Sequence, residues 1–126
     1  MSVIPELFER GSAIRTEVLG RAHVERSHQT KNAFTEDFQA YITQHAWGAI
    51  WARPGLERKT RSMLTIAMLA ALGHHEELKL HIRATRNTGV TSDEVKEILL
   101  QVAVYAGVPA ANSAFRIARE VYDEAG

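Results

Sequence analysis

Residues 57–72, with the sequence ERKTRSMLTIAMLAAL, decide the fold class of this chain. From Met63 to Leu72 nearly every residue is apolar, and these residues fall on all sides of a helix with 3.6 residues per turn. Such a helix is typical of the centre of a protein, where neighbours cover every face. No stretch alternates between apolar and polar residues as a half-buried strand would. An all-α fold is therefore predicted.

The remaining sequence predicts five more helices, so that a single domain over residues 1–126 forms a compact bundle of about six helices. The five are predicted at residues 5–19, 35–51, 75–87, 92–106 and 110–124, and residues 20–32 are predicted to be a polar connection. Thr35 is expected to cap the helix that follows it, and Thr91 forms a capping box with Glu94. Gly89 is expected to end a helix in the left-handed conformation.

The composition limits the class of partner. The 15 basic residues balance 15 acidic ones, so the chain has no long-range field for nucleic acid or for an anionic membrane. The absence of cysteine excludes disulfides, thiolate metal sites and thiol redox chemistry. Residues 1–11 do not resemble a signal peptide, and no apolar run approaches the roughly 20 residues of a membrane span. We expect a cytoplasmic protein that binds a small molecule.

Two predicted helices carry more apolar surface than a chain of this size can cover by itself. Residues 57–72 and 92–106 are apolar nearly all round. Exposed apolar surface on this scale marks contacts between subunits. The sequence therefore predicts a homo-oligomer.

Three ionisable residues are predicted to lie on buried helix faces. Glu77 and His81 are four residues apart and share the face of their helix that is expected to be core. Arg61 falls on the stripe of the central helix that also carries Leu64 and Met68. A buried guanidinium needs a carboxylate, which either Glu77 or a ligand supplies. The three residues predict an active site, with two alternatives: a purely structural network, and a metal ion held by Glu77 and His81.

Several short motifs, in order along nearly the whole chain, resemble the γ-carboxymuconolactone decarboxylase family. The two most distinctive are WGAIW at residues 47–51 and YAGVPA at residues 105–110. Shorter matching runs are VLG at 18–20, RPGL at 53–56, RS at 61–62, EL at 77–78 and NTGVT at 87–91. The wider superfamily includes disulfide reductases in which two cysteines precede a histidine. Here His74, Glu77 and His81 stand at those three positions, so the thiols are replaced.

The resemblance implies a specific activity and assembly. It implies an all-α subunit in a ring-type oligomer, a hexamer or a trimer, that converts 4-carboxymuconolactone to 3-oxoadipate enol-lactone in protocatechuate breakdown. The substrate is an unsaturated lactone whose own carbonyl accepts the electrons released with carbon dioxide. We therefore expect no cofactor and no metal, in line with the absence of their sequence motifs.

The resemblance also places Arg61, Glu77 and His81 at the family's active site. His81 is expected to protonate the α carbon, and Glu77 to orient the imidazole and favour its charged form. Arg61 is the first candidate to bind the substrate's other carboxylate, because its planar fork of donors matches a carboxylate. Arg53 is the second candidate.

Three residues upstream are expected to complete the substrate site. Trp47 and Trp51, one helical turn apart, predict either core anchors or an apolar wall near the departing carboxylate. His23 is expected to contribute a hydrogen bond from the connection that contains it.

Two other functions stay open from the sequence. The chain is alternatively a paralogue acting on another lactone or on a β-keto acid, since the shape of the pocket decides the substrate. It is alternatively a non-catalytic helical oligomer that binds a carboxylate metabolite.

Overall fold

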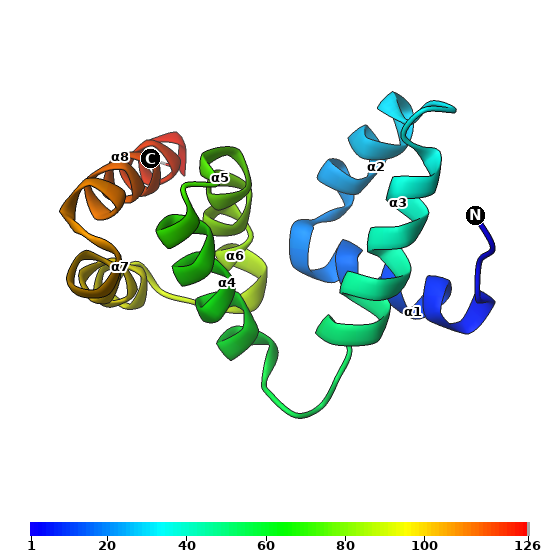
Figure 1. Ribbon diagram of the computed structural model, residues 1–126, viewed down its shortest axis with the longest axis horizontal. Helices are drawn as coiled ribbons and strands as arrows, with labels where there is room; N and C mark the ends of the chain where they lie inside the picture. Colours follow the sequence, from blue (N-terminus) through cyan, green and yellow to red (C-terminus); the bar gives the residue numbers. More distant parts are fainter. Residues whose placement is uncertain (126) are drawn as a thin grey trace. The chain divides into compact units, whose positions relative to one another are not determined.

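The computed structural model describes residues 1–125, which form helices joined by short turns, with no strand among them (Figure 1). The all-α prediction is therefore confirmed. The elements are α1 (Pro5–Leu19), α2 (Arg21–Thr30), α3 (Glu36–Ile42), the π-helix η1 (Thr43–Trp51), α4 (Arg58–Leu72), α5 (His75–Arg83), α6 (Thr85–Thr88), α7 (Ser92–Ala106) and α8 (Val108–Ala125). Their contacts group them into two compact units, the first ending at Glu57 and the second beginning at Arg58. The prediction of one domain over residues 1–126 stays a prediction.

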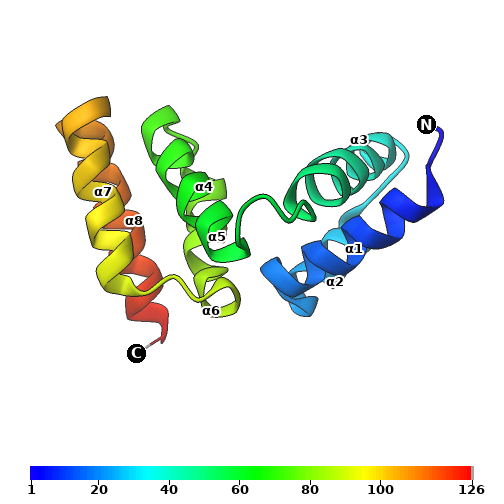
Figure 2. The same ribbon diagram turned by 90° about the horizontal axis from the view of Figure 1, so that it is seen from below.

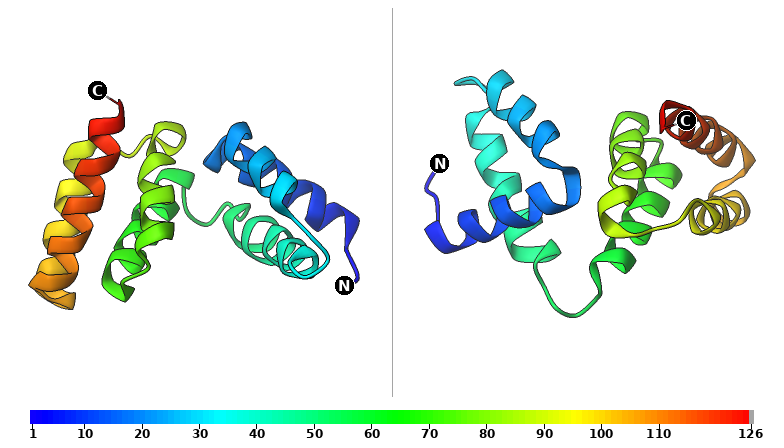
Figure 3. Two further views of the ribbon diagram at one scale, coloured as in Figure 1. Left: turned by 90° about the horizontal axis from the view of Figure 1, so that it is seen from above. Right: turned by 180° about the vertical axis from the view of Figure 1, so that it is seen from behind.

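The first unit is held together by the crossing of α1 and η1, which is visible in Figure 3. Two glycines allow the crossing. A methyl group placed on Gly11 would overlap the carbonyl oxygen of Thr43 and lie 2.9 Å from the backbone nitrogen of Gly48. A methyl group on Gly48 would overlap the carbonyl oxygen of Leu7. The two helices thus approach backbone to backbone, at a distance that no larger residue permits.

Residues 20–32 are not the polar connection that the sequence predicted, because most of them form α2. Gly20 adopts a φ of 92°, which turns the chain after Leu19 and lets a new helix start at once. Val24 is the one buried residue of α2. Because α2 buries so little, its sequence shows almost no regular spacing of apolar residues, and the helix was therefore not predicted.

The helix predicted at residues 35–51 is present, but its second half is a π-helix. At its end the backbone N–H of Ala52 donates to the carbonyl of Trp47 at 3.1 Å, a bond that spans five residues. The predicted cap is wrong, since the side chain of Thr35 makes no capping hydrogen bond to α3. Thr35 Oγ1 instead accepts from the backbone N–H of Asn32 at 3.1 Å, within the turn that precedes the helix.

In the second unit α4 packs against α5, α7 and α8, and α7 and α8 form a hairpin that turns at Gly107 (Figure 2). The core residues of this unit include Ile66, Ala70, Leu78, Ile82, Val95, Leu99, Val102, Ala114, Ile117 and Val121. The prediction that α4 is buried on every side is wrong for the single chain. Its buried stripe is Ser62, Ile66 and Ala70. The stripe that contains Arg61 is accessible to solvent in the single chain, because Leu64 is 47% and Met68 is 56% exposed.

The local signals at the helix ends of the second unit are confirmed. Thr91 and Glu94 form the predicted capping box at the start of α7. Gly89 ends α6 with a φ of 85°, and its N–H donates to the carbonyl of Thr85 at 2.9 Å. The helix predicted at residues 75–87 is divided into α5 and α6 around Ala84. No helix among residues 1–125 has the length and hydropathy that a membrane span requires.

Replacement of Gly11 or Gly48 by alanine should destabilise the first unit by at least about 2 kcal/mol, because the added methyl meets backbone that cannot move aside. The loss should appear even though alanine favours a helix over glycine by about 1 kcal/mol. Gly55→Ala is the matched control, since nothing lies within 4 Å of its added methyl, and it should change stability by less than about 0.5 kcal/mol. Urea denaturation followed by circular dichroism measures all three. Equal stabilities would contradict the close crossing.

Candidate active site

His81 is a buried imidazole on α5. The helix presents Leu78, His81 and Ile82 to the core at the spacing of one helical face, and His81 is 9% exposed. Lys79 and Arg83 lie on the other side, as predicted. Arg83 forms an ion pair of 2.6 Å with Glu124 of α8, and Lys79 pairs with Glu120 at 3.5 Å. The burial of Leu78 and Ile82 fixes the rotation of α5 so that its histidine faces inward, and the ion pairs lie on the accessible side of the helix.

Glu77 is not in the centre of the buried face, which corrects the sequence prediction for the single chain. It is exposed. The buried stripe of α5 follows Leu78 and Ile82, and Glu77 lies at its margin in the first turn, close to the turn at Gly73. Glu77 still precedes His81 by four residues on one helix, so the two side chains occupy neighbouring turns. The structure thus combines a buried imidazole with an accessible carboxylate.

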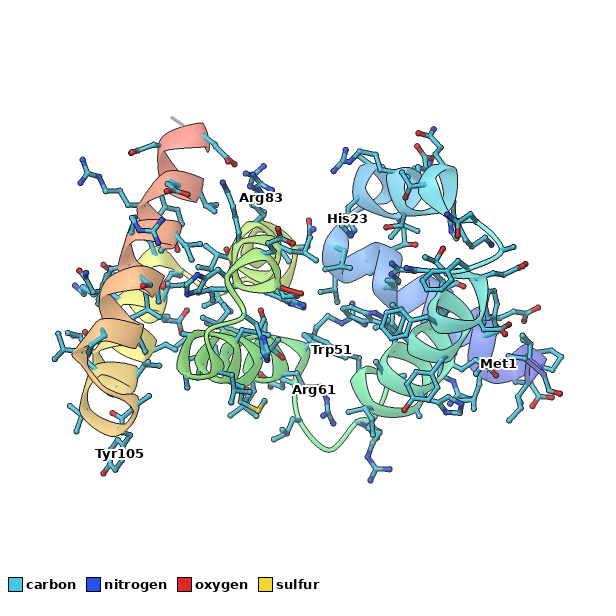
Figure 4. All side chains as sticks on the ribbon, turned by 45° about the horizontal axis from the view of Figure 1, so that its top comes forward. Met1, His23, Trp51, Arg61, Arg83 and Tyr105 are labelled. Carbon is cyan, nitrogen blue, oxygen red and sulfur yellow. The ribbon has the colours of Figure 1, made fainter. Side chains whose placement is uncertain are left out.

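Arg61 lies in the first turns of α4 and is half-buried (Figure 4). Its neighbour Ser62 is fully buried and accepts a hydrogen bond of 2.9 Å from Thr88 Oγ1, which ties the start of α4 to α6. The carbonyl of Arg61 accepts from Thr65 Oγ1 at 2.8 Å. Because α4 packs against α5, Arg61 and His81 stand on adjacent helices of one unit.

The other four predicted site residues belong to the first unit. Trp47 and Trp51 stack with their ring centroids 4.9 Å apart and an interplanar angle of 29°. Trp47 is buried and Trp51 half-buried, so the pair is anchored in the core of this unit and keeps one ring accessible. His23 is half-buried on α2, and Arg53 is exposed just after η1 (Figure 4 labels His23 and Trp51).

Sequence reasoning missed Arg15, which is buried on α1 at 6% exposure. Gly11, Arg15 and Val18 are the three buried residues of that helix. Their spacing of four and three residues is that of one helical face, so the pattern was available in the sequence.

A large groove in the second unit does not contain the candidate residues. It has a volume of about 840 Å³ and lies between α4 and α7. Its lining is mostly apolar, with Leu64 and Met68 among its residues, and also includes Asp93, Glu94 and Glu97. Arg61, Glu77 and His81 do not line it. Three carboxylates in the lining disfavour a dianionic ligand, so this groove is better suited to an apolar surface.

Within the described part of the chain, no three histidine, aspartate or glutamate side chains lie close enough together to hold a metal ion.

Comparison with known proteins decides the family. Residues 36–120 match the model of the carboxymuconolactone decarboxylase family. The chain belongs to this family. The matched region contains the two tryptophans and the three candidate residues Arg61, Glu77 and His81, whereas His23 precedes it.

Two relatives are similar over nearly the whole chain. A 4-carboxymuconolactone decarboxylase of Acinetobacter baylyi is 51% identical over 119 residues, which cover 94% of this chain and 89% of that protein. A nitrosuccinic acid decarboxylase of Metarhizium robertsii is 39% identical over 118 residues, covering 94% of this chain and 82% of the relative. Both names describe the loss of carbon dioxide from a small carboxylic acid.

Proposed function

We propose that this member of the family decarboxylates 4-carboxymuconolactone to 3-oxoadipate enol-lactone in the β-ketoadipate route of protocatechuate breakdown. The observation that carries the proposal is the identity of 51% over 94% of the chain with a relative that bears this name. The buried imidazole of His81 beside an accessible carboxylate supports it, because the reaction needs a proton donor in a site with restricted access to water. The cytoplasm is the proposed location, as for a metabolic enzyme.

The substrate itself explains how the reaction proceeds. The bond between the γ carbon and its carboxylate breaks, and the electron pair moves through the ring double bond into the lactone carbonyl. Carbon dioxide leaves, and the remaining dienolate takes one proton at the α carbon to give the enol-lactone. The protein has to orient the substrate, stabilise the enolate oxygen and deliver that proton.

We assign the proton delivery to His81 and its orientation to Glu77. A buried imidazole keeps its position because the packing of α5 fixes it. An exposed carboxylate four residues earlier is accessible both to the imidazole and to solvent, so it can guide the return of a proton from water to His81.

The remaining substrate contacts are proposed from the resemblance to the family. Arg61 is proposed to bind the carboxylate that stays on the product, and Arg53 is the second candidate for this role. The stacked Trp47 and Trp51 are proposed to form an apolar wall, which disfavours the charged carboxylate relative to the transition state. His23 is proposed to donate a further hydrogen bond.

Nitrosuccinic acid is a second candidate substrate, favoured by the relative that is 39% identical. Its nitro group can accept the electrons released with carbon dioxide, as the lactone carbonyl does. The same active-site groups would serve both reactions, so an assay with each compound separates the two functions.

We also propose that the α4–α7 groove is covered by another copy of the chain in a homo-oligomer, a hexamer or a trimer. Leu64 and Met68 are both about half exposed in the single chain, and Tyr105, at the end of α7, is 82% exposed (Figure 4). All three line the groove. Apolar surface of this extent is stabilised when a second subunit excludes water from it.

Purified protein in heavy water, with a chelator and no added cofactor, should consume 4-carboxymuconolactone and place one deuterium at the α carbon of the product. The label is expected because the proton comes from solvent through His81, and the chelator should leave the rate unchanged because no metal is proposed. Absorbance of the lactone gives the rate, and mass spectrometry of early-quenched samples gives the label. A product without solvent deuterium, or a rate that requires a divalent ion, would refute this mechanism.

His81→Ala and Glu77→Gln should each lower kcat by about 10²- to 10⁴-fold, the range for lost acid–base work. Glu76→Gln is the matched control, since Glu76 is also exposed in the first turn of α5, and it should retain kcat. A Glu77→Gln variant with wild-type kcat would remove the role given to Glu77.

Arg61→Lys should not restore the activity lost in Arg61→Ala, because an ammonium cannot bind a carboxylate through two parallel hydrogen bonds.

Light scattering should return a mass of at least three times the 14.1 kDa of one chain at micromolar concentration. The double variant Leu64→Asp, Met68→Asp should shift the mass toward that of the single chain, because two carboxylates in an apolar contact are costly to desolvate. Leu56→Asp is the control, since Leu56 is 42% exposed and does not line the groove. A wild-type mass of about 14 kDa would exclude the oligomer.

A further inference from the structure

The first unit contains a buried positive charge that no residue of the described chain neutralises. Arg15 is 6% exposed, and its Nε–H has no hydrogen-bond acceptor among residues 1–125. Burial lowers the pKa of Arg15, and no acidic neighbour offsets that effect. A guanidinium removed from water without a partner is strongly unfavourable, so a stable fold needs a compensating group.

A small cavity lies against this arginine. It has a volume of about 150 Å³ and is lined in part by Arg15, His28, Lys31, Gln39 and Thr43. The carbonyl oxygen Oε1 of Gln39 is also buried without a hydrogen-bond donor. The cavity therefore presents the buried Nε–H donor of Arg15 together with two further basic side chains, whereas the Gln39 oxygen needs a donor such as water.

The charges at the cavity favour one negative charge over two. His28 and Lys31 are exposed and remain in contact with water, and the exposed Glu36 opposes them. The one deeply buried charge is that of Arg15. A ligand with a single negative charge neutralises it, whereas a second negative charge would be desolvated without compensation.

The size of the cavity selects a small ligand. A cavity of about 150 Å³ in another protein holds a molecule of the size of benzene, about six non-hydrogen atoms. Pockets for whole metabolites are usually larger, at roughly 300 Å³ or more. The planar fork of an arginine matches the two oxygens of a carboxylate.

We propose that the cavity beside Arg15 binds a single carboxylate group, which is held by the N–H donors of the Arg15 guanidinium. The residues of this site differ from those assigned to the active site above, and its existence does not rest on the proposed function. The carboxylate comes from one of two sources, a free monovalent acid such as acetate or formate, or one carboxylate arm of a larger substrate.

The test uses acetate as the probe and the full chain. Sodium acetate at about 100 mM should raise the unfolding temperature of the wild type by at least about 4 °C over sodium chloride at equal ionic strength, because a ligand that binds the native state stabilises it. Chloride is the reference since it cannot form two parallel hydrogen bonds. Arg15→Met should lose this rise, and it should unfold at a higher temperature than the wild type in chloride, because the uncompensated charge is gone.

Arg10→Met is the matched control, since Arg10 lies on the same helix and is exposed. It should keep the full acetate effect. Isothermal titration calorimetry of the wild type gives the affinity directly, and Arg15→Lys, which keeps the charge without the fork, should weaken it at least fivefold if Arg15→Met does not fold. An acetate effect that is absent from the wild type, or equal in the wild type and the Arg15 variant, would overturn the proposal and leave a bridging water as the occupant.

Kinetics separates the two sources of the carboxylate. If acetate competes with 4-carboxymuconolactone and Arg15→Lys raises KM, the site holds an arm of the substrate. If acetate binds and KM is unaffected by it, the site takes a free acid. Because binding is measured without turnover, an inactive enzyme that still binds acetate would refute the proposed function and support the site.

Discussion

The backbone contact between α1 and η1 determines the structure of the first unit. Gly11 and Gly48 bring the two helices together so closely that the carbonyls of Thr43 and Leu7 occupy the space of the missing side chains. Trp47 of η1 and Arg15, one turn after Gly11 on α1, are buried residues of the two helices that cross here. The same pair of helices carries the stacked tryptophans and the buried charge of the proposed carboxylate site.

The second unit depends on a different constraint, the apolar stripe of α5. Leu78 and Ile82 are fully buried in the core, and the stripe carries His81 inward with them. An imidazole in this position is 9% exposed and loses contact with water on most sides. Glu77, at the margin of the same stripe, keeps contact with water. A buried imidazole next to an accessible carboxylate suits a proton donor that must be reprotonated from solvent after each turnover.

The chemistry proposed for the chain needs little from the protein beyond orientation, a proton and a dry environment. A substrate that carries its own electron acceptor explains how related chains act on compounds as different as a lactone and a nitro acid, since both leave a stabilised carbanion. Arginines suit such substrates because every substrate of a decarboxylase is a carboxylate. The chain has no net charge, so the proposed mechanism relies on individual guanidinium groups to bind these anions rather than on a field of the whole protein.

The sequence by itself determined the fold class, the bounds of α1 and α7, the capping box at Thr91 and the helix stop at Gly89, because these depend on local backbone chemistry and apolar period. It also pointed to His81 as a buried ionisable group. Tertiary structure alone decided that α4 buries the stripe of Ser62 rather than that of Arg61, and that Glu77 is exposed. The physical reason is that the spacing of apolar residues shows which faces of a helix are apolar, whereas burial depends on which neighbouring segments of the fold cover those faces. The π-helix, the polar helix α2 and the close approach at Gly11 depend in the same way on contacts between distant segments.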